Sequence, residues 1–445
     1  MTIKKERLRS LSRLVRMPAN LAAGLIAKGG AVRSSLRLTR KGSGLPFGRP
    51  LPPFYSASLR DGLVASSDGP LPPLPPEDAA LVDFIRSETE KRNRNNITRT
   101  AAYLDIYLAR PELHWALLAH LVSRNGGWSM TDLQGEWLPE LLDTGYREAA
   151  FGLLEACNSL IFGDAYPQLL LYIESRRIGR DLTPLLPRFG ASAFMKPFWR
   201  RFIEDGNPLP LSEALIVNEQ HFIQSRVVED EFFAENVLNA PAFRLQPLLQ
   251  TNQIVLPLLP ETNDNRTSLT NKPLTLVGRV LENFPDLRER IAFGRCLYRI
   301  LFGYPAVLSR ALAFATSTPH SGSRSDYWPL RFSPAPAPAP VPGAPANEKA
   351  GVPPVATGKD AGGSPNAGWR SPRLGDAWED RPPRPSLGAD WFVGLEQLKH
   401  LRPCRMPRII DMTHEHLLGQ NKFQTAVLLE RSFMNGASKR RTGRG

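Results

Sequence analysis

The residues best suited to chemistry gather in two short segments that lie about 190 residues apart. The first segment combines a guanidinium, an amide, an indole and a carboxylate around Gly126-Gly127. These side chains belong to Arg124, Asn125, Trp128 and Asp132. A glycine turn that brings backbone N–H groups close to such side chains suits a phosphate or carboxylate ligand. The structural alternative is an ordinary connection between two helices, in which these polar residues cap the helix ends.

The second segment, PHSGSRSDYWP at residues 319–329, has little local structure to explain its composition. It supplies further candidate residues for ligand binding, namely His320, Arg324, Asp326, Tyr327 and Trp328. Hydrogen-bonding and aromatic side chains in a loop are a stronger sign of function than the same types in a core. Ser, His and Asp all occur here, but closeness in sequence is not the geometry of a catalytic triad.

We predict that the two segments form one exposed recognition surface. Each is too polar for a core, yet each carries tryptophan beside arginine and a carboxylate, which is the composition of a binding hot spot. On this hypothesis, Arg124→Ala and Arg324→Ala abolish activity and leave the melting temperature nearly unchanged. The alternative is that both segments cap helices, with their Trp rings covering the ends of the bundle.

Three further candidates lie on predicted helices. His114 and His120 are six residues apart, about 240° around a helix, so they do not form the i, i+4 pair of a helical zinc site. A single His on an apolar helix is more often a packed residue than a ligand. Glu219 belongs to a polar quartet at 218–221 inside an otherwise apolar stretch. Common nucleotide, dehydrogenase and hydrolase motifs are absent, and the three cysteines are far apart, so we expect no metal and no cofactor.

Helical spacing of apolar residues dominates the chain and predicts an all-α fold, a single multi-helix domain over residues 76–333. Near the first segment we expect one helix capped by Asn96, a second over 112–124 that ends at the glycines, and a third that starts at Ser129. Residues 211–239 contain no Gly or Pro and predict one long helix. Residues 274–280 are the best candidate for a strand.

Composition separates this domain from its flanks. Residues 1–75 are basic and rich in Pro and Gly, and predict a disordered arm. Residues 334–389 form a Pro/Ala/Gly-rich linker, in which only SPRLGDAWED at 371–380 carries enough apolar surface to dock on the body. Residues 390–435 predict a small helical segment, and a basic tail follows at 436–445.

The net charge of +13 resides in the two ends of the chain. Residues 1–45 hold eleven Lys and Arg against one acid, Glu6, and the last ten residues hold four more basic side chains, so the body between them nets −1. A near-neutral body is unlike a nucleic-acid footprint, which needs a basic face. Leu8, Leu11 and Val15 give the arm an amphipathic pattern suited to an anionic membrane surface. A solvated, unstructured arm is the alternative.

Several segments, in order, resemble the signature segments of the YppC-like bacterial family, a domain of unknown function. They are NRNNITRTAAYLDIY, HWALLAHLVSRNGGWSMTDLQG, GDAYPQLLLYIESRR, ALIVNEQHFI and HSGSRSDYWP. The resemblance covers about residues 76–333. It implies the limits of the domain and a bacterial, intracellular setting, and it assigns no catalytic residue.

These observations favour a cytoplasmic, non-enzymatic helical protein that binds a partner protein or a small anionic ligand, with its arm at the membrane surface. The alternative is a hydrolase for an anionic substrate. Its acid–base groups would come from His120, Asp132 or His320, and its anion clamps would be Arg124 or Arg324. A hydrolase requires the two segments to meet in one concave pocket with the histidines facing in.

Overall fold

The computed structural model describes residues 28–65, 71–244, 252–260, 274–334, 369–384 and 389–442. Helices make up most of these residues, and the strands are short, so the all-α prediction is confirmed. A helix at 28–38 precedes α2. The other α-helices are α2 (Pro53–Ala65), α3 (Pro76–Arg92), α4 (Asn96–Ala109), α5 (His114–Asp132), α6 (Leu138–Leu141), α7 (Thr144–Ile178), α8 (Lys196–Asp205), α9 (Pro208–Ile223), α10 (Glu231–Phe233), α11 (Pro241–Arg244), α13 (Leu287–Gly303), α14 (Pro305–Ser317), α15 (Leu374–Ala377) and α16 (Thr413–Thr442).

Short helical turns and strands connect these helices. The 3₁₀ turns are η1 (Thr183–Phe189), η2 (Ala193–Met195), η5 (Arg324–Asp326) and η6 (Leu395–Leu401), and the π turns are η3 (Gln224–Val228) and η4 (Ala234–Leu238). The strands are β1 (Gln253–Leu258), β2 (Thr275–Val280), β3 (Phe332–Ser333) and β4 (Trp369–Arg370). β1 and β2 are antiparallel, whereas β3 and β4 are parallel. The strand predicted at 274–280 is β2, and it is confirmed.

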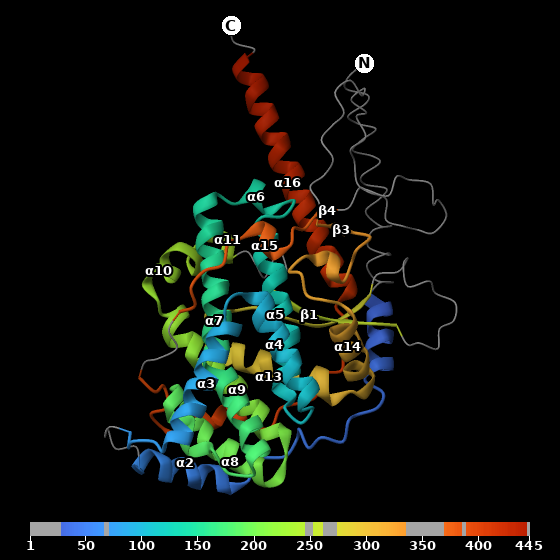
Figure 1. Ribbon diagram of the computed structural model, residues 1–445. Coiled ribbons are helices and arrows are strands. Elements are labelled where there is room, and N and C mark those ends of the chain that lie inside the picture. Colours follow the sequence, from blue (N-terminus) through green and yellow to red (C-terminus); the bar gives the residue numbers. More distant parts are fainter. Residues whose placement is uncertain are drawn as a thin grey trace.

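Helix α5 is the central element of the fold. It contacts α4, α7, α9, α13 and β1, and Figure 1 shows it enclosed among the long helices. Its buried residues occur on all sides, as expected for a helix inside a bundle. Most of the side chains that α5 carries therefore contact a neighbouring element.

The turn predicted at Asn125-Gly126-Gly127 is wrong, because α5 runs unbroken through it and no new helix starts at Ser129. The two glycines serve close packing instead. A Cβ at Gly127 would lie 2.4 Å from Asn96 Oδ1 and 2.6 Å from His320 Nε2. Without a side chain at this position, a polar layer from two other segments can approach the α5 backbone.

Two other predicted helix boundaries change. Asn95 rather than Asn96 caps α4: its side chain accepts from Thr98 N, and the Thr98 hydroxyl accepts from Asn95 N in return. The long helix predicted over 211–239 is also wrong. Helix α9 ends at Ile223, and a π turn follows it. The Asp230 side chain then accepts from Phe233 N and caps the separate short helix α10.

The region 1–75 is not a disordered arm throughout. Leu38, Phe47, Tyr55 and Leu59 are buried in the main core, and the Ser35 hydroxyl accepts hydrogen bonds from the backbone of residues 410 and 411. Residues 28–65 therefore belong to the folded body. The amphipathic pattern predicted for residues 1–16 lies outside the described residues.

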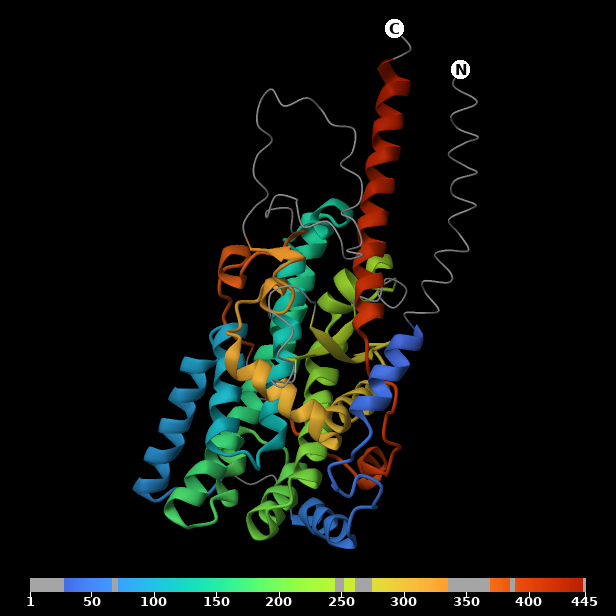
Figure 2. The same cartoon turned by 90° about the vertical axis from the view of Figure 1, so that its right-hand side faces the viewer.

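The linker and C-terminal segment also pack on the body. Residues 369–384 pair through β4 with β3, and the SPRLGDAWED segment docks as predicted: Trp378 stacks on Phe151 with 4.3 Å between ring centroids. Asp411 forms a bridge with Val277 of β2. Figures 1 and 2 show α16 leaving this contact and projecting beyond the bundle. Residues 335–368 lie outside the described residues.

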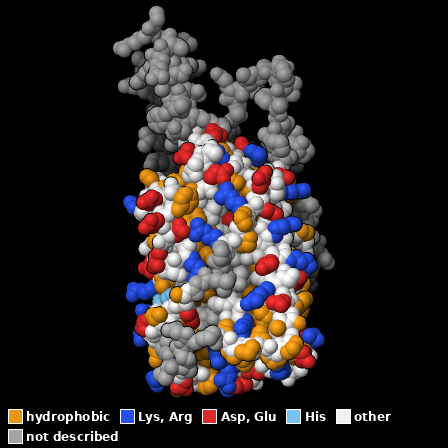
Figure 3. Space-filling view, turned by 60° about the vertical axis from the view of Figure 1, so that its left-hand side comes forward, with side chains coloured by type: hydrophobic (Ala, Val, Ile, Leu, Met, Phe, Trp, Pro, Cys, Tyr) orange, Lys and Arg blue, Asp and Glu red, His pale blue; other side chains and the backbone are white. Residues whose placement is uncertain are grey.

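No single helix among the described residues is long and apolar enough to span a membrane; α13 and α14 together satisfy the length and composition, but they meet at a bend of 95°. On the face shown in Figure 3, acidic and basic side chains alternate with apolar ones over the folded body. This mixture agrees with the near-neutral net charge of residues 46–435.

A candidate ligand cavity along the central helix

A cavity of about 650 Å³, partly open to the surface, lies beside α5 and is bordered by α7, α9, β1, α13 and α16. Its volume is within the range of small-molecule sites, about 300–1,000 Å³. Most of its wall is apolar, with a small number of polar groups at distinct places. Binding sites for small organic molecules share this combination of an apolar body and few polar groups.

One face of α5 forms the floor of the cavity. Its lining side chains recur at three- and four-residue spacing, from Trp115 through Leu118, Val122 and Ser129 to Leu133. At about 1.5 Å per residue, this stripe is about 27 Å long. The cavity is therefore elongated along the helix axis.

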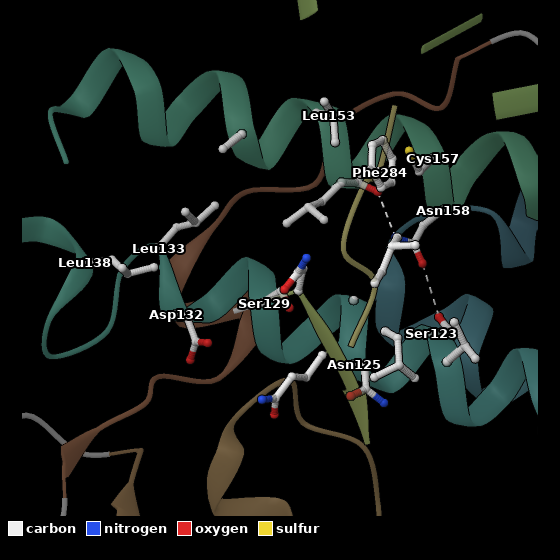
Figure 4. A pocket seen from close by; sticks show the side chains of 18 of the residues that line it. Ser123, Asn125, Ser129, Asp132, Leu133, Leu138, Leu153, Cys157, Asn158 and Phe284 are labelled. Atoms are coloured by element: carbon white, nitrogen blue, oxygen red, sulfur yellow. Dashed lines mark hydrogen bonds between the residues drawn. The ribbon is translucent and has the colours of Figure 1, made fainter. Parts of the chain in front are cut away.

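Helix α7 forms the opposite wall with a matching stripe that includes Leu153, Cys157 and Asn158 (Figure 4). Asn158 connects the two helices, since its Oδ1 accepts from the Ser123 hydroxyl of α5 at 3.5 Å, while its amide donates to Leu154 O within α7. Burial raises the pKa of the Cys157 thiol to about 12. This thiol is therefore protonated and weakly nucleophilic at neutral pH.

The polar groups of the wall occur at two ends of this stripe. Near its start, Glu219 of α9 accepts from Trp115 Nε1 at 3.1 Å and from the Gln220 amide at 3.0 Å. Arg290 of α13 donates to Gln220 Oε1 and Gln224 Oε1. Burial raises the pKa of Glu219 to about 8 and lowers that of Arg290 to about 10.

At the other end, Arg324 and Asp132 form an ion pair with three hydrogen bonds of 2.7–2.9 Å. Arg324 also donates to the Tyr327 hydroxyl, which lies 2.9 Å from His416 Nε2. Because the tyrosine oxygen already accepts from Arg324, its proton points to His416 Nε2. His416 Nδ1–H then donates to Gln253 Oε1 at 3.0 Å, which sets the neutral tautomer of the ring.

The two sequence segments thus meet in space, but they are not an exposed surface. Trp128, Tyr327 and Trp328 are 0%, 1% and 4% exposed and pack together in one apolar cluster. Trp128 Nε1 donates to Asp326 Oδ2 at 3.3 Å. The predicted exposure of these tryptophans is wrong, because α5 passes through the interior and brings its polar side chains with it.

The proposed anion clamps are both engaged by the protein. Arg124 is fully buried, and its guanidinium donates to Thr318 O at 2.7 Å and to Pro319 O at 3.2 Å. Burial lowers the pKa of Arg124 to about 10, while Asp326 opposes that shift. Arg124 therefore fastens the 318–328 segment to α5, as Arg324 does through Asp132.

The histidines are packing residues in this geometry. His114 stacks on Phe302 at 3.9 Å, His120 Nδ1 lies 2.8 Å from Thr100 O, and His320 Nε2 lies 2.8 Å from Asn96 Oδ1. Burial lowers the pKa of His114 to about 4 and that of His120 to about 3. Both rings are therefore neutral at physiological pH.

Of the twelve predicted site residues, four line the cavity: Asn125, Asp132, Glu219 and Arg324. Asn125 joins α5 to β1, with its amide donating to Val255 O and its Oδ1 accepting from Val255 N. The sequence interpretation missed Tyr103, Trp115, Gln253, Arg290 and His416, which also line the wall. The three- and four-residue spacing of the lining residues on α5 is visible in the sequence. The same spacing is typical of a helix face packed in the core, so it does not indicate a cavity.

Metal ligation has no support from the geometry, because the described residues contain no group of three or more His, Cys, Asp or Glu placed to hold an ion. His416 lies near the acidic residues Asp411 and Glu415 in the sequence. Its two ring nitrogens contact Tyr327 and Gln253, and not the neighbouring acidic residues.

Comparisons with known proteins place this chain in a family. The family model described as "Protein of unknown function (DUF2515)" matches residues 91–359. The uncharacterised protein YppC of Bacillus subtilis (strain 168) is 39% identical over 250 residues, which cover 55% of this chain and 72% of that protein. Comparison with solved structures finds no match. The resemblance to the YppC-like family is therefore confirmed, and the chain belongs to the DUF2515 family of proteins of unknown function.

Proposed function

We propose that this protein is a non-enzymatic binding protein that holds an elongated, mainly apolar small molecule in the cavity beside α5. The observation that carries the proposal is the cavity itself: about 650 Å³ of space between packed helices, with a mainly apolar wall. Protein interiors are normally close-packed, and a large void deprives its lining of contacts. A bound apolar molecule restores those contacts and removes its own surface from water.

The polar contacts give less support to the two anion-directed hypotheses. A small anionic ligand or anionic substrate needs free donors, whereas Arg124 and Arg324 both donate to protein oxygens. A hydrolase also needs a free acid–base group at the cavity. His120 and His320 do not line it, and Asp132, which does, is held in its ion pair with Arg324. Binding of an apolar ligand is therefore the function that the cavity favours.

Cavity-filling substitutions test the proposal. Ala119 and Ser129 line the cavity from α5, so Ala119→Phe and Ser129→Phe place a ring in the ligand space. We expect each variant to weaken binding of a fluorescent apolar probe by at least about tenfold, or 1.4 kcal/mol. Ala101→Phe on the exposed side of α4 is the matched control and should bind the probe normally.

Thermal melting of the same variants identifies folding defects. Equal probe binding by all three variants and the unmodified protein would place the probe elsewhere and contradict the proposal. Organic extraction of protein purified from its source, followed by mass spectrometry, should in addition release an apolar compound from the unmodified protein and less of it from Ser129→Phe.

We further propose a cytoplasmic location, with residues 1–45 in contact with an anionic membrane surface. The free thiols of Cys157, Cys296 and Cys404 support a reducing compartment. The charge of the first 45 residues supports the membrane contact, and the mixed charge of the body makes nucleic acid a weaker partner for it.

A further inference from the structure

One carboxyl group on the cavity wall lacks a countercharge. Among the described residues, no Lys, Arg or His forms an ion pair with Glu219. Its contacts are two neutral donors, Trp115 Nε1 and the Gln220 amide. Each carboxylate oxygen can accept more than one hydrogen bond, so both retain acceptor capacity. Buried acids are normally paired, and this exception requires an explanation.

Glu219 lines the cavity from α9. The side chain lies deep enough for burial to shift its pKa strongly, yet it keeps partial surface exposure and lines the cavity. Its remaining acceptor capacity is therefore available to a molecule in that space.

Two aromatic rings border the same end of the cavity. Tyr103 and Trp115 both line it and pack edge to face, with ring centroids 5.4 Å apart and planes at 88°. Aromatic faces attract cations through their quadrupoles, and rings beside a carboxylate are a recurrent setting for an ammonium group. The rings supply apolar surface beside the carboxyl group, and Trp115 also donates to it, so the missing countercharge is the observation that points to a positively charged ligand group.

The surrounding charges agree with this assignment. Asp164 on α7 acts on Glu219 as a second buried acid, and its Oδ1 has no hydrogen-bond partner. On α4, Arg99 is neutralised by its ion pair with Glu155. Arg290 on α13 is the cation on this part of the wall, and its guanidinium donates to Gln220, Gln224 and Phe284 O. No ion pair therefore balances Glu219, whereas Asp132 at the other end of the cavity is paired with Arg324.

We infer that the cavity takes a lipophilic amine, with its ammonium group at Glu219 beside Tyr103 and Trp115 and its hydrocarbon body along α5. This inference rests on the proposed function and adds the ligand class. An amine satisfies the unpaired carboxyl, whereas an alcohol leaves it without a countercharge and a fatty acid adds a like charge.

The test compares three ligands with one chain and different head groups: octylamine, octanol and octanoate, each below its micelle limit, with the full-length protein in calorimetry. We expect octylamine to bind at least tenfold more tightly than the other two. Glu219→Gln should abolish that preference, because the amide keeps the shape and removes the charge. Glu136→Gln, at the other end of the cavity, should retain it.

The pH dependence gives a second readout. Octylamine binding should strengthen as the pH rises from 6 to 9 and Glu219 ionises, and this rise should disappear in Glu219→Gln. Tightest binding of octanoate, or an amine preference that survives Glu219→Gln in a folded variant, would overturn the inference. Equal binding of all three, blocked by Ser129→Phe, would also overturn it and leave the proposed function intact. Absence of binding by all three contradicts both.

Discussion

Arg324 and Asp132, 192 residues apart in sequence, form an ion pair in which both Nε and one terminal nitrogen of the guanidinium donate to the carboxylate. The Arg324 side chain is 9% exposed and that of Asp132 is 27% exposed. This pair lines one end of the cavity and joins the 318–328 segment to α5. It is a structural connection, so its removal affects folding before it affects any ligand.

Arg324→Ala should therefore destabilise the protein by about 3–5 kcal/mol, because it leaves a partly buried carboxylate without its partner. The change is to be measured by chemical denaturation. Arg176→Ala, on the exposed end of α7, is the control and should change the free energy of unfolding by less than about 0.5 kcal/mol. A near-normal stability of Arg324→Ala would restore the hypothesis that this arginine is held free for a ligand.

Gly127→Ala should be destabilising even though alanine is the better helix former. Alanine normally gains about 1 kcal/mol over glycine inside a helix. At this position the added Cβ would overlap Asn96 Oδ1 and His320 Nε2, both held by other contacts. In Gly152→Ala on α7, the nearest atom is the flexible end of Arg381 at 3.3 Å, so a normal gain is expected. Thermal melting of both variants distinguishes the two effects. Steric overlap lowers the melting temperature of Gly127→Ala, and helix propensity raises that of Gly152→Ala.

Trp378→Ala should detach residues 371–380 from the body. The indole stacks on Phe151, and its Nε1 donates to Met130 O at 2.8 Å. Loss of a large buried aromatic side chain costs about 3–5 kcal/mol. Trp378→Phe should cost less, because it keeps the stacking and loses the hydrogen bond. Increased proteolytic cleavage within 371–380 in Trp378→Ala, and much less in Trp378→Phe, is the expected pattern.

Stability should decrease as the pH rises from about 6.5 to 8. Below that range the buried histidines, neutral in the folded protein and charged in the unfolded chain, act in the opposite direction. Burial raises the pKa of Glu219 from 4.5 to about 8 and that of Asp164 from 3.8 to about 7. The folded protein therefore keeps protons that the unfolded chain has released, so unfolding becomes easier with rising pH until both groups ionise. Glu219→Gln should flatten this slope, whereas Glu235→Gln on the exposed surface should not. Denaturation at pH 5, 6.5 and 8 measures the slopes, and an unchanged slope in Glu219→Gln would contradict the assignment.

Removal of residues 1–27 should weaken binding to anionic vesicles without unfolding the body. These residues hold six Lys and Arg, each worth about 1 kcal/mol near an anionic surface. The truncation begins at residue 28 because Leu38, Phe47 and Tyr55 belong to the core. Binding by the full chain should fall with added salt. Equal vesicle binding by both proteins would contradict the prediction, and competition by a polyanion would expose nucleic acid as the rival partner.

The sequence by itself determined the helical fold, the β2 strand and the docking of residues 371–380. These features follow from local spacing of apolar residues, and an isolated Leu and Trp in a Pro/Gly-rich segment require burial somewhere. The break between α13 and α14 is local in the same way, because Pro305 suits the first turn of a helix and stops the one before it.

Only the tertiary structure decided what the polar residues do. Gly126-Gly127 indicated a turn because glycine tolerates turn geometry, yet the same absence of a side chain permits the close approach of Asn96 and His320. Trp128 and Arg324 indicated an exposed site by composition, but their partners arrive from almost 200 residues away. The cavity is likewise invisible in the sequence, because an empty space depends on how far α5, α7 and α13 stand apart, and no local pattern encodes that distance.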